Sequence, residues 1–279
     1  MELNNEGGKL TPRVRLAMRL RRLRERKGLS LRQLSERVGG YSHSYLGRVE
    51  LGSQLPSEAL VNMLDDVFDT DGVLAELLEM AHDSVIADYS RKIVNKEPEA
   101  ERIQVFTSSL VPGLLQTPAY AHALFRRSLP DESEEEVHDR VTVRMRRQRI
   151  FHGEDPPYYW AIMDEAALRR PVGGAACMVE QLERLLRAAA RPRTTVQVLP
   201  FTRGAHPMLG GGLTLMTLKD GASVALVESF DSGEGADSPK RVVQLTDRFD
   251  LARSLALTDD ESIELVRRYL KGYEDDDDS

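Results

Sequence analysis

The sequence has a single cysteine, Cys177, and no long run of apolar residues. One cysteine cannot form an intramolecular disulfide or a cysteine-rich zinc module, which favours a reducing, cytoplasmic location. Residues 1–9 are polar where a signal peptide would carry an apolar core. No stretch approaches the ~20 apolar residues that a membrane-spanning helix needs. The sequence therefore argues against secretion and against membrane insertion.

The sequence also lacks the short motifs of common catalytic and metal sites. Its histidines show no HExxH spacing, and no GxSxG nucleophile elbow is present. The glycine triplet 210–212 precedes a predicted strand, which indicates a tight turn instead of a phosphate-binding loop. Cys177 lies on an apolar helical stripe, as a buried small residue does, and Asp164-Glu165 lies at a strand-to-helix junction where acids favour the helix start. We expect no catalytic residue, no metal and no cofactor.

The length of 279 residues favours two domains, and 41% apolar residues exclude a fully disordered chain. The net charge of −7 is unevenly distributed along the chain. Residues 1–55 hold 12 Lys or Arg and 5 Asp or Glu, a net charge of +7, so the remaining residues carry −14. Basic residues concentrate at 9–27, and ten acids with no Lys or Arg lie at 49–90. A basic face beside an acidic one is typical of a protein that binds a polyanion.

Residues 11–90 have the periodicity and capping residues of five short helices. Thr11-Pro12 begins the first helix and Gly28 ends it. Ser30 and Ser42 can cap the second and third helices, with Gly39-Gly40 as the turn between them. Two further helices follow Ser57 and Gly72. We therefore predict an all-helical domain at 11–90, preceded by a disordered arm at 1–10.

The rest of the chain mixes strand and helix patterns. Strands are expected near 103–106, 158–163, 195–199, 213–218 and 223–228. Helices are expected at 118–129, 133–151, 164–170, 175–190, 239–255 and 259–270. We predict an α+β domain at 102–272, a linker at 91–101 and a disordered acidic tail at 273–279.

Residues 28–52, GLSLRQLSERVGGYSHSYLGRVELG, resemble the XRE family of phage-repressor-like helix-turn-helix regulators. The resemblance implies a five-helix, lambda-repressor-like fold whose third helix reads double-stranded operator DNA in the major groove. The base-reading positions that it implies are Ser42, His43, Ser44, Gly47 and Arg48. Arg48 is the strongest of these candidates, because a guanidinium can bond bidentately to guanine O6 and N7.

The chain departs from this family at the start of the second helix and in the turn. Many relatives carry Gln where this chain has Leu31, so Ser30 and Arg32 are the polar candidates for DNA contact there. The Gly39-Gly40 pair adds one residue to the turn. Arg24 and Glu50 match family positions that pair, which implies a structural ion pair.

The remaining arginines of the first helix allow two interpretations. They either contact phosphate or form a solvated helix face, and Arg21 is the candidate that we assign to DNA binding. The others are Arg13, Arg15, Arg19 and Arg22.

Three further strings, VPGLLQTPAYA (111–121), RMRRQRI (144–150) and DEAALRRPVGG (164–174), resemble the C-terminal domain of the Scr1-type, antitoxin-like regulators. That domain belongs to a family described as a domain of unknown function. The resemblance implies a DNA-binding, antitoxin-like regulator that is often encoded beside a small partner protein.

Two features of this domain leave alternatives open. The basic run at 140–149, with Arg144 and Arg147, either docks a small acidic partner protein or balances neighbouring acids. Gln116 and Tyr120 either line a partner-binding groove or pack in the core.

The sequence as a whole predicts a cytoplasmic, repressor-like transcriptional regulator. A homodimer is expected, because one short recognition helix reads few bases and a two-fold pair doubles the contacts. The C-terminal domain would dimerise, sense a partner or ligand, or do both. The alternative is an antitoxin-like interaction protein that mainly binds and sequesters a small partner, with DNA binding secondary.

Overall fold

The computed structural model describes residues 10–230 and 232–277, which form two compact units. The first unit comprises residues up to Ala87 together with Asp131–Val143. The second comprises Asp88–Pro130 and the residues from Arg144 onward. The disordered arm predicted at 1–10 lies outside the described residues except for Leu10.

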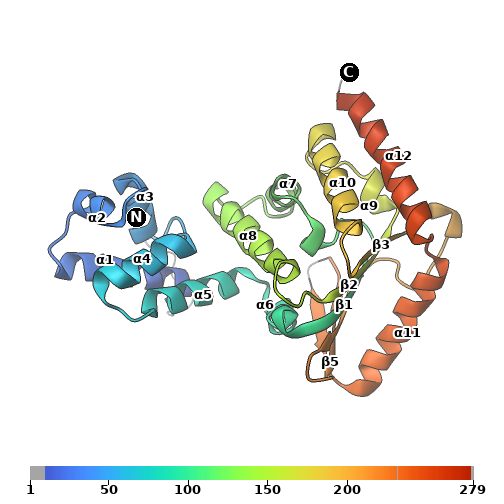
Figure 1. Ribbon diagram of the computed structural model, residues 1–279, viewed down its shortest axis with the longest axis horizontal. Helices are drawn as coiled ribbons and strands as arrows, with labels where there is room; N and C mark the ends of the chain where they lie inside the picture. Colours follow the sequence, from blue (N-terminus) through green and yellow to red (C-terminus); the bar gives the residue numbers. More distant parts are fainter. Residues whose placement is uncertain (1–9, 231, 278–279) are drawn as a thin grey trace. The chain divides into compact units, whose positions relative to one another are not determined.

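The first unit contains the five predicted helices (Figure 1). They are α1 (Pro12–Arg26), α2 (Leu31–Val38), α3 (His43–Glu50), α4 (Glu58–Phe68) and α5 (Val73–Val85). Each of the first four begins after a hydroxyl side chain that accepts a hydrogen bond from a backbone N–H of the first turn. Both glycines of the turn between α2 and α3, Gly39 and Gly40, have positive φ, which a residue with a Cβ adopts only at a cost. Local chemistry thus explains the predicted helix boundaries.

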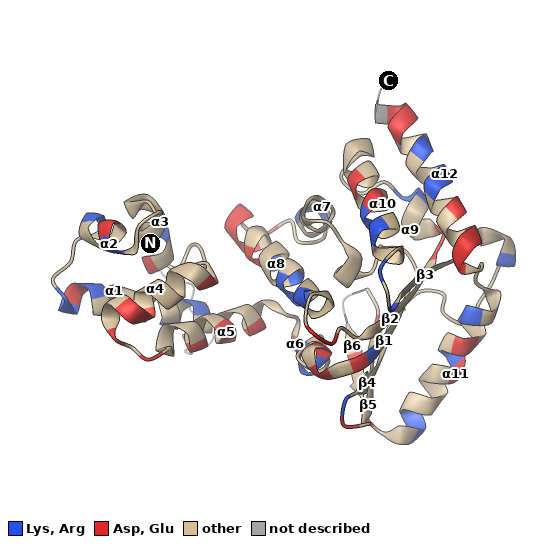
Figure 2. Cartoon of the chain, viewed as in Figure 1, with Lys and Arg blue, Asp and Glu red and all other residues tan. Residues whose placement is uncertain are grey.

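Leucines from all five helices form the core of this unit. Leu20, Leu34, Leu46, Leu64 and Leu78 are each at most 1% exposed. The first part of α8 (Glu134–Arg147) also belongs to this unit, which the sequence did not predict. Figure 2 shows acids at the start of α8 and basic residues at its end, a distribution that complements the helix dipole.

The second unit contains a six-stranded mixed sheet with the order β3-β2-β1-β4-β5-β6. The strands are β1 (Ala100–Thr107), β2 (Tyr158–Asp164), β3 (Thr194–Leu199), β4 (Gly212–Leu218), β5 (Ser223–Glu228) and β6 (Gly233–Ala236). β1, β2 and β3 are parallel, whereas β4, β5 and β6 continue the sheet in antiparallel pairs. The predicted α+β class of the second domain is thereby confirmed.

Helices cover both faces of this sheet (Figure 1). On one face, Ile103 and Val105 pack in a core with α10 (Ala175–Ala189) and α12 (Asp259–Asp277). On the other face, Phe106 packs in a core with α11 (Pro239–Leu255). The remaining elements are α6 (Asp88–Val94), η1 (Glu97–Glu99), η2 (Gly113–Leu115), α7 (Pro118–Ser128), η3 (Gln148–Phe151), α9 (Ala166–Arg169) and η4 (Phe201–Arg203).

Two segments that we predicted as irregular are ordered secondary structure. Residues 91–101, predicted as a linker, form the end of α6, η1 and the start of β1. Ile93 of α6 is buried and lies against Gly235 of β6, so tertiary packing holds this charged segment. The tail from residue 273 continues α12 as far as Asp277. Tyr273 holds this last part of the helix, because its hydroxyl donates to the backbone oxygens of Leu168 and Arg169.

No helix within residues 10–230 and 232–277 is both long and apolar enough to cross a membrane. The same residues contain no group of three or more His, Cys, Asp or Glu that could hold a metal ion.

Candidate nucleic-acid interface

The outward face of α3 is the strongest candidate surface for base contact. Ser42 caps this helix by accepting a hydrogen bond from the backbone N–H of Tyr45 at 3.1 Å. Ser44, Arg48 and Leu51 follow at four- and three-residue intervals, so they share one face of the helix, and all three are exposed. Leu46 and Val49 on the opposite face are buried. The cap and this burial define which side chains of α3 face outward.

The Arg48 guanidinium is held by two neighbouring side chains. Its Nε donates to Oε1 of Gln54 at 3.0 Å, and its Cζ lies 5.9 Å from the centre of the Tyr45 ring. Tyr45 in turn stacks on Tyr41, with ring centres 5.8 Å apart. A guanidinium has five N–H groups, so within the described part of the chain the two terminal nitrogens keep four for a base. Because its Nε is already held, the Arg48 guanidinium loses less conformational entropy when it binds a base.

The other predicted positions of α3 differ in how they lie. Ser42 is the helix cap, and His43 is exposed in the first turn. Gly47 is half-buried on the side of α3 that faces α2. A Cβ added at Gly47 would lie 3.6 Å from the Leu31 side chain of α2. Ser44 and Arg48 are therefore the predicted base readers that α3 presents together.

At the start of α2, Ser30 and Arg32 lie where the sequence placed a DNA contact. Ser30 and Gln33 form a capping box: Ser30 Oγ accepts from the Gln33 backbone N–H at 3.2 Å, and Gln33 Oε1 accepts from the Ser30 N–H at 2.8 Å. Arg32 is exposed one position inside the helix. Arg32 is thus the cation at this helix end that can meet a phosphate.

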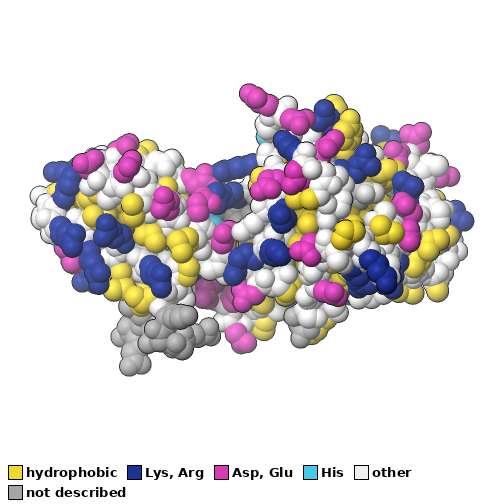
Figure 3. All heavy atoms as spheres, turned by 90° about the horizontal axis from the view of Figure 1, so that it is seen from below, with side chains coloured by type: hydrophobic (Ala, Val, Ile, Leu, Met, Phe, Trp, Pro, Cys, Tyr) yellow, Lys and Arg dark blue, Asp and Glu magenta, His cyan; other side chains and the backbone are white. Residues whose placement is uncertain are grey.

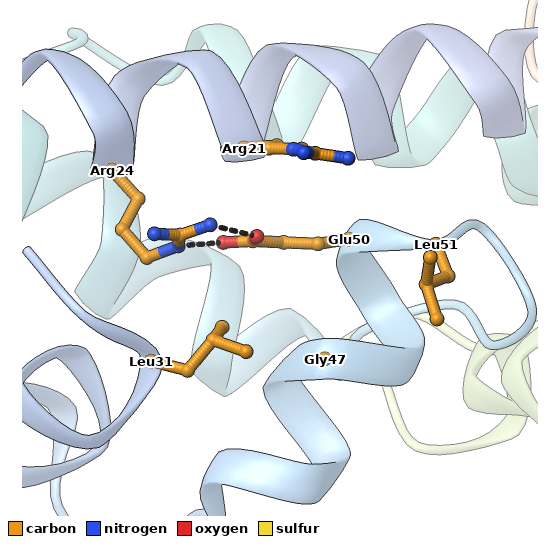
Figure 4. A pocket seen from close by; sticks show the side chains of 6 residues that line it. All are labelled: Arg21, Arg24, Leu31, Gly47, Glu50 and Leu51. Carbon is orange, nitrogen blue, oxygen red and sulfur yellow. Dashed lines mark hydrogen bonds and ion pairs between the residues drawn. The ribbon is translucent and has the colours of Figure 1, made fainter.

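Arg24 and Glu50 pair between α1 and α3 beside a hollow of about 250 Å³ (Figure 4). Arg24 Nε donates to Glu50 Oε1 at 2.6 Å, and a terminal nitrogen donates to Oε2 at 2.7 Å. The side chains are 14% and 5% exposed, respectively. Arg21, Leu31, Gly47 and Leu51 line the rest of the hollow, and Figure 4 shows the Arg21 side chain on the α1 side of the ion pair.

The arginines of α1 do not form a single surface. Ala17 and Arg24 face α3 and the turn after it, because Arg24 bonds to Glu50 and a Cβ added at Gly52 would lie 3.5 Å from Ala17. Arg15, Arg19 and Arg22 are exposed on roughly the opposite side of the helix, given 3.6 residues per turn. Figure 3 shows Lys and Arg side chains gathered on the visible face of the helical unit. Among the predicted α1 candidates, Arg21 is the exposed one that shares the hollow beside α3.

The predicted partner-binding residues lie in the second unit and are largely enclosed. Gln116 is 2% and Tyr120 is 0% exposed, and burial raises the pKa of Tyr120 to about 12. Arg144 donates to Gln116 Oε1 at 2.6 Å, whereas Arg147 pairs with Glu97 at 2.6 Å. All four side chains therefore make hydrogen bonds, ion pairs or packing contacts within the chain.

Sequence reasoning missed three residues near this interface. Gln54 holds Arg48, Leu51 is 61% exposed at the end of α3, and Asp139 of α8 is buried against Arg13 of α1. The Gln54 contact and the Leu51 exposure depend on how the chain turns after α3. Asp139 lies 126 residues from Arg13, so no local pattern signals it.

Comparison with known families covers both parts of the chain. Residues 15–78 match the model of a helix-turn-helix domain. Residues 90–268, more than half of the chain, match the model of the Domain of unknown function (DUF5753). Searches of the curated proteins and of the solved structures found no match. These matches confirm both sequence resemblances, and the chain belongs to the DUF5753 family, with a helix-turn-helix domain in its N-terminal part.

Proposed function

We propose that this protein is a sequence-specific DNA-binding transcriptional regulator in which α3 reads the major groove. The observation that carries the proposal is the position of the Arg48 side chain and its bonding. This side chain lies on the outward face of α3, and Gln54 engages its Nε while the terminal nitrogens point to no described partner. A bidentate contact from such a fork to guanine contributes about 1–3 kcal/mol of discrimination against another base.

Neighbouring groups would position the helix on the DNA backbone. Arg32 at the start of α2 and Arg21 beside α3 are exposed cations, and phosphate contacts of this kind fix register without reading sequence. Ser44 and His43 in the first turn of α3 can add hydrogen bonds to a base or a phosphate. Double-stranded operator DNA is thus the partner to which this surface is best suited.

The proposal includes a homodimer in the cytoplasm. α3 has only eight residues, so one copy reads few base pairs. Two copies would read half-sites ~34 Å apart. We assign dimerisation, the sensing of a partner or ligand, or both to the DUF5753 part of the chain.

The alternative role, sequestration of a small acidic partner, has less support. It drew on the basic run of α8, whose members bond within the chain. Arg140 pairs with Glu132 and donates to the Val85 backbone oxygen, whereas Arg147 pairs with Glu97.

The proposal is tested by selecting duplexes from a randomised pool with the full-length protein and measuring the affinity of the selected duplex between 50 and 200 mM salt. The logarithm of the binding constant should fall by about 0.9 per phosphate contact for each tenfold rise in salt. Sedimentation on the same duplex would give the number of copies bound. A flat salt response, or selection of no preferred sequence, would contradict the proposal.

A further inference from the structure

The 52–55 loop, residues Gly52–Leu55 between α3 and α4, contacts Arg48 at both its backbone and its side chain. The backbone N–H and the hydroxyl of Ser53 both donate to the Arg48 carbonyl oxygen at 3.1 Å. Gln54 accepts from the Arg48 Nε at 3.0 Å. The position of this loop therefore decides where the Arg48 fork lies.

Arg13 of α1 holds the first half of the loop. Its Nε donates to the Gly52 carbonyl oxygen at 2.6 Å, and a terminal nitrogen donates to the carbonyl oxygen of Ser53. The other terminal nitrogen donates to Asp139 Oδ2 at 2.7 Å. The Arg13 side chain is 20% exposed, so its position depends on these partners and not on solvent.

Asp139 lies beside the second half of the loop. It is 3% exposed on the part of α8 that belongs to the first unit, and its partner Arg13 bonds to the loop. Burial raises the pKa of Asp139, whereas Arg13 and the Leu55 N–H stabilise its charged form. A buried carboxylate is costly unless it is paired and hydrogen-bonded, so Asp139, Arg13 and the loop stabilise one arrangement together.

We infer that Asp139 is a positioning residue for base reading by Arg48, acting through the 52–55 loop. The inference rests on the proposed function of α3. It gives a residue of the DUF5753 region a part in the sequence preference of the helix-turn-helix domain. Loss of the Asp139 carboxylate removes the partner of Arg13, which holds the loop, and recognition groups must be held within about 0.5 Å to keep their geometry.

The test measures how strongly binding depends on the guanine that Arg48 contacts. With full-length protein, a preferred duplex is selected, and the guanine whose identity ceases to matter in Arg48→Ala is identified. Affinity is then compared between that duplex and one carrying 7-deazaguanine at the position, which lacks the N7 acceptor. We expect about a tenfold loss for the wild type, because 7-deazaguanine removes the N7 half of the bidentate contact and keeps O6. For Asp139→Asn and Gln54→Ala we expect a loss below about threefold, because the fork no longer lies in place.

A matched control is Glu135→Gln, which makes the same charge change on an exposed residue of the same helix. It should keep the tenfold dependence, so a general effect of charge on DNA affinity is separated from positioning. Circular dichroism and the unfolding midpoint establish that each variant is folded. If Asp139→Asn does not fold, Asp139→Glu and Arg13→Lys take its place, since each keeps the charge but changes the geometry of the contacts.

The outcomes separate this inference from the proposed function. If folded variants of Asp139 or Arg13 keep the wild-type dependence on N7 while Arg48→Ala loses it, the inference is wrong and α3 is still the reading helix. If the wild type selects no duplex, or Arg48→Ala keeps the full preference, the proposed function fails and the inference fails with it.

Discussion

Arg24 and Glu50 join α1 to α3 through two parallel hydrogen bonds of 2.6 and 2.7 Å. The third nitrogen of the Arg24 guanidinium donates to the Leu29 carbonyl oxygen at 2.8 Å, just before α2. Arg24 of α1 thereby bonds both to α3 and to the segment just before α2. Because the pair is largely buried, its contribution is to the arrangement of these helices and not to DNA contact.

Substituting Glu50 by Ala should lower the free energy of unfolding by about 3 kcal/mol, because it leaves the Arg24 charge without its buried partner. Urea unfolding followed by far-ultraviolet circular dichroism measures this change. Glu25→Ala is the matched control, since Glu25 pairs with Arg21 on the exposed side of α1 and should matter little. Equal losses for the two variants would show that the buried Arg24–Glu50 pair contributes no more to stability than the exposed pair.

Substituting Arg48 by Ala should relax sequence preference by about 1–3 kcal/mol at one base pair, because the bidentate contact is lost. Arg21→Ala should instead weaken binding to all duplexes alike, as loss of a phosphate contact does. Electrophoretic mobility shifts with the selected duplex and with single-base variants measure both effects. The same pattern of loss in both variants would mean that α3 is not the helix that reads bases.

Two glycine substitutions around α3 should have opposite signs. Gly47→Ala should stabilise the protein by about 0.5–1 kcal/mol, because Ala favours the helix and the new Cβ has ordinary contact distance to Leu31. Gly40→Ala should destabilise it by about 1–2 kcal/mol, because Gly40 has a φ of +67°. Thermal unfolding of the two variants gives the signs. A stabilised Gly40→Ala would show that the turn adopts another conformation.

Cys177 should react slowly with iodoacetamide near neutral pH. Burial raises the pKa of its thiol, so less of the reactive thiolate is present at a given pH than for an ordinary cysteine. The labelling rate of Cys177 should therefore keep rising with pH beyond the pH at which the labelling rate of a free thiol stops rising. Mass spectrometry of labelled protein against glutathione measures both rates, and a rate that levels off at lower pH than that of glutathione would contradict the expected direction.

Substituting Gln116 by Ala should lower the free energy of unfolding by about 2–3 kcal/mol, because it removes the buried hydrogen bonds that Gln116 makes with Arg144 and with the Val111 carbonyl oxygen. Gln244→Ala is the control on an exposed position of α11. Chemical unfolding of both variants tests whether Gln116 is a core residue. Unchanged stability together with loss of a co-purifying small protein would instead assign Gln116 to partner binding.

The helices of the first unit could be predicted because their signals are local. Ser30 and Ser42 cap within three residues of their own position, and the glycines of the turns adopt positive φ without a tertiary partner. The candidate base readers were implied by the resemblance to the XRE family, and the start of α3 defines which of them share a face with Arg48. The place of Gly47 is different, because its packing beside Leu31 depends on how α2 lies against α3.

The elements that we did not predict from the sequence are those stabilised by contacts between distant segments. β6, with the sequence GEGA, has little strand propensity, but it pairs with β5 and α6 packs against its glycines. Residues 88–94 are polar and short for a helix, and the burial of Ile93 and Val94 supports α6. Strand order also depends on contacts between distant segments, because β4 pairs with β1 and a long stretch of chain connects them.

The sequence by itself determined the helix-turn-helix region, the mixed second domain and the charge difference between them, because capping, periodicity and residue counts are properties of short segments. Only the tertiary structure decided which arginines bond within the fold and which lie exposed beside α3. Arg13 and Arg21 lie in the same basic helix, yet Arg13 is bonded to Asp139 and the 52–55 loop, whereas Arg21 is exposed beside α3 and pairs with the exposed Glu25. The physical reason is that an arginine takes its role from the carboxylates and carbonyl oxygens within hydrogen-bond distance, and those partners come from segments far apart in the chain.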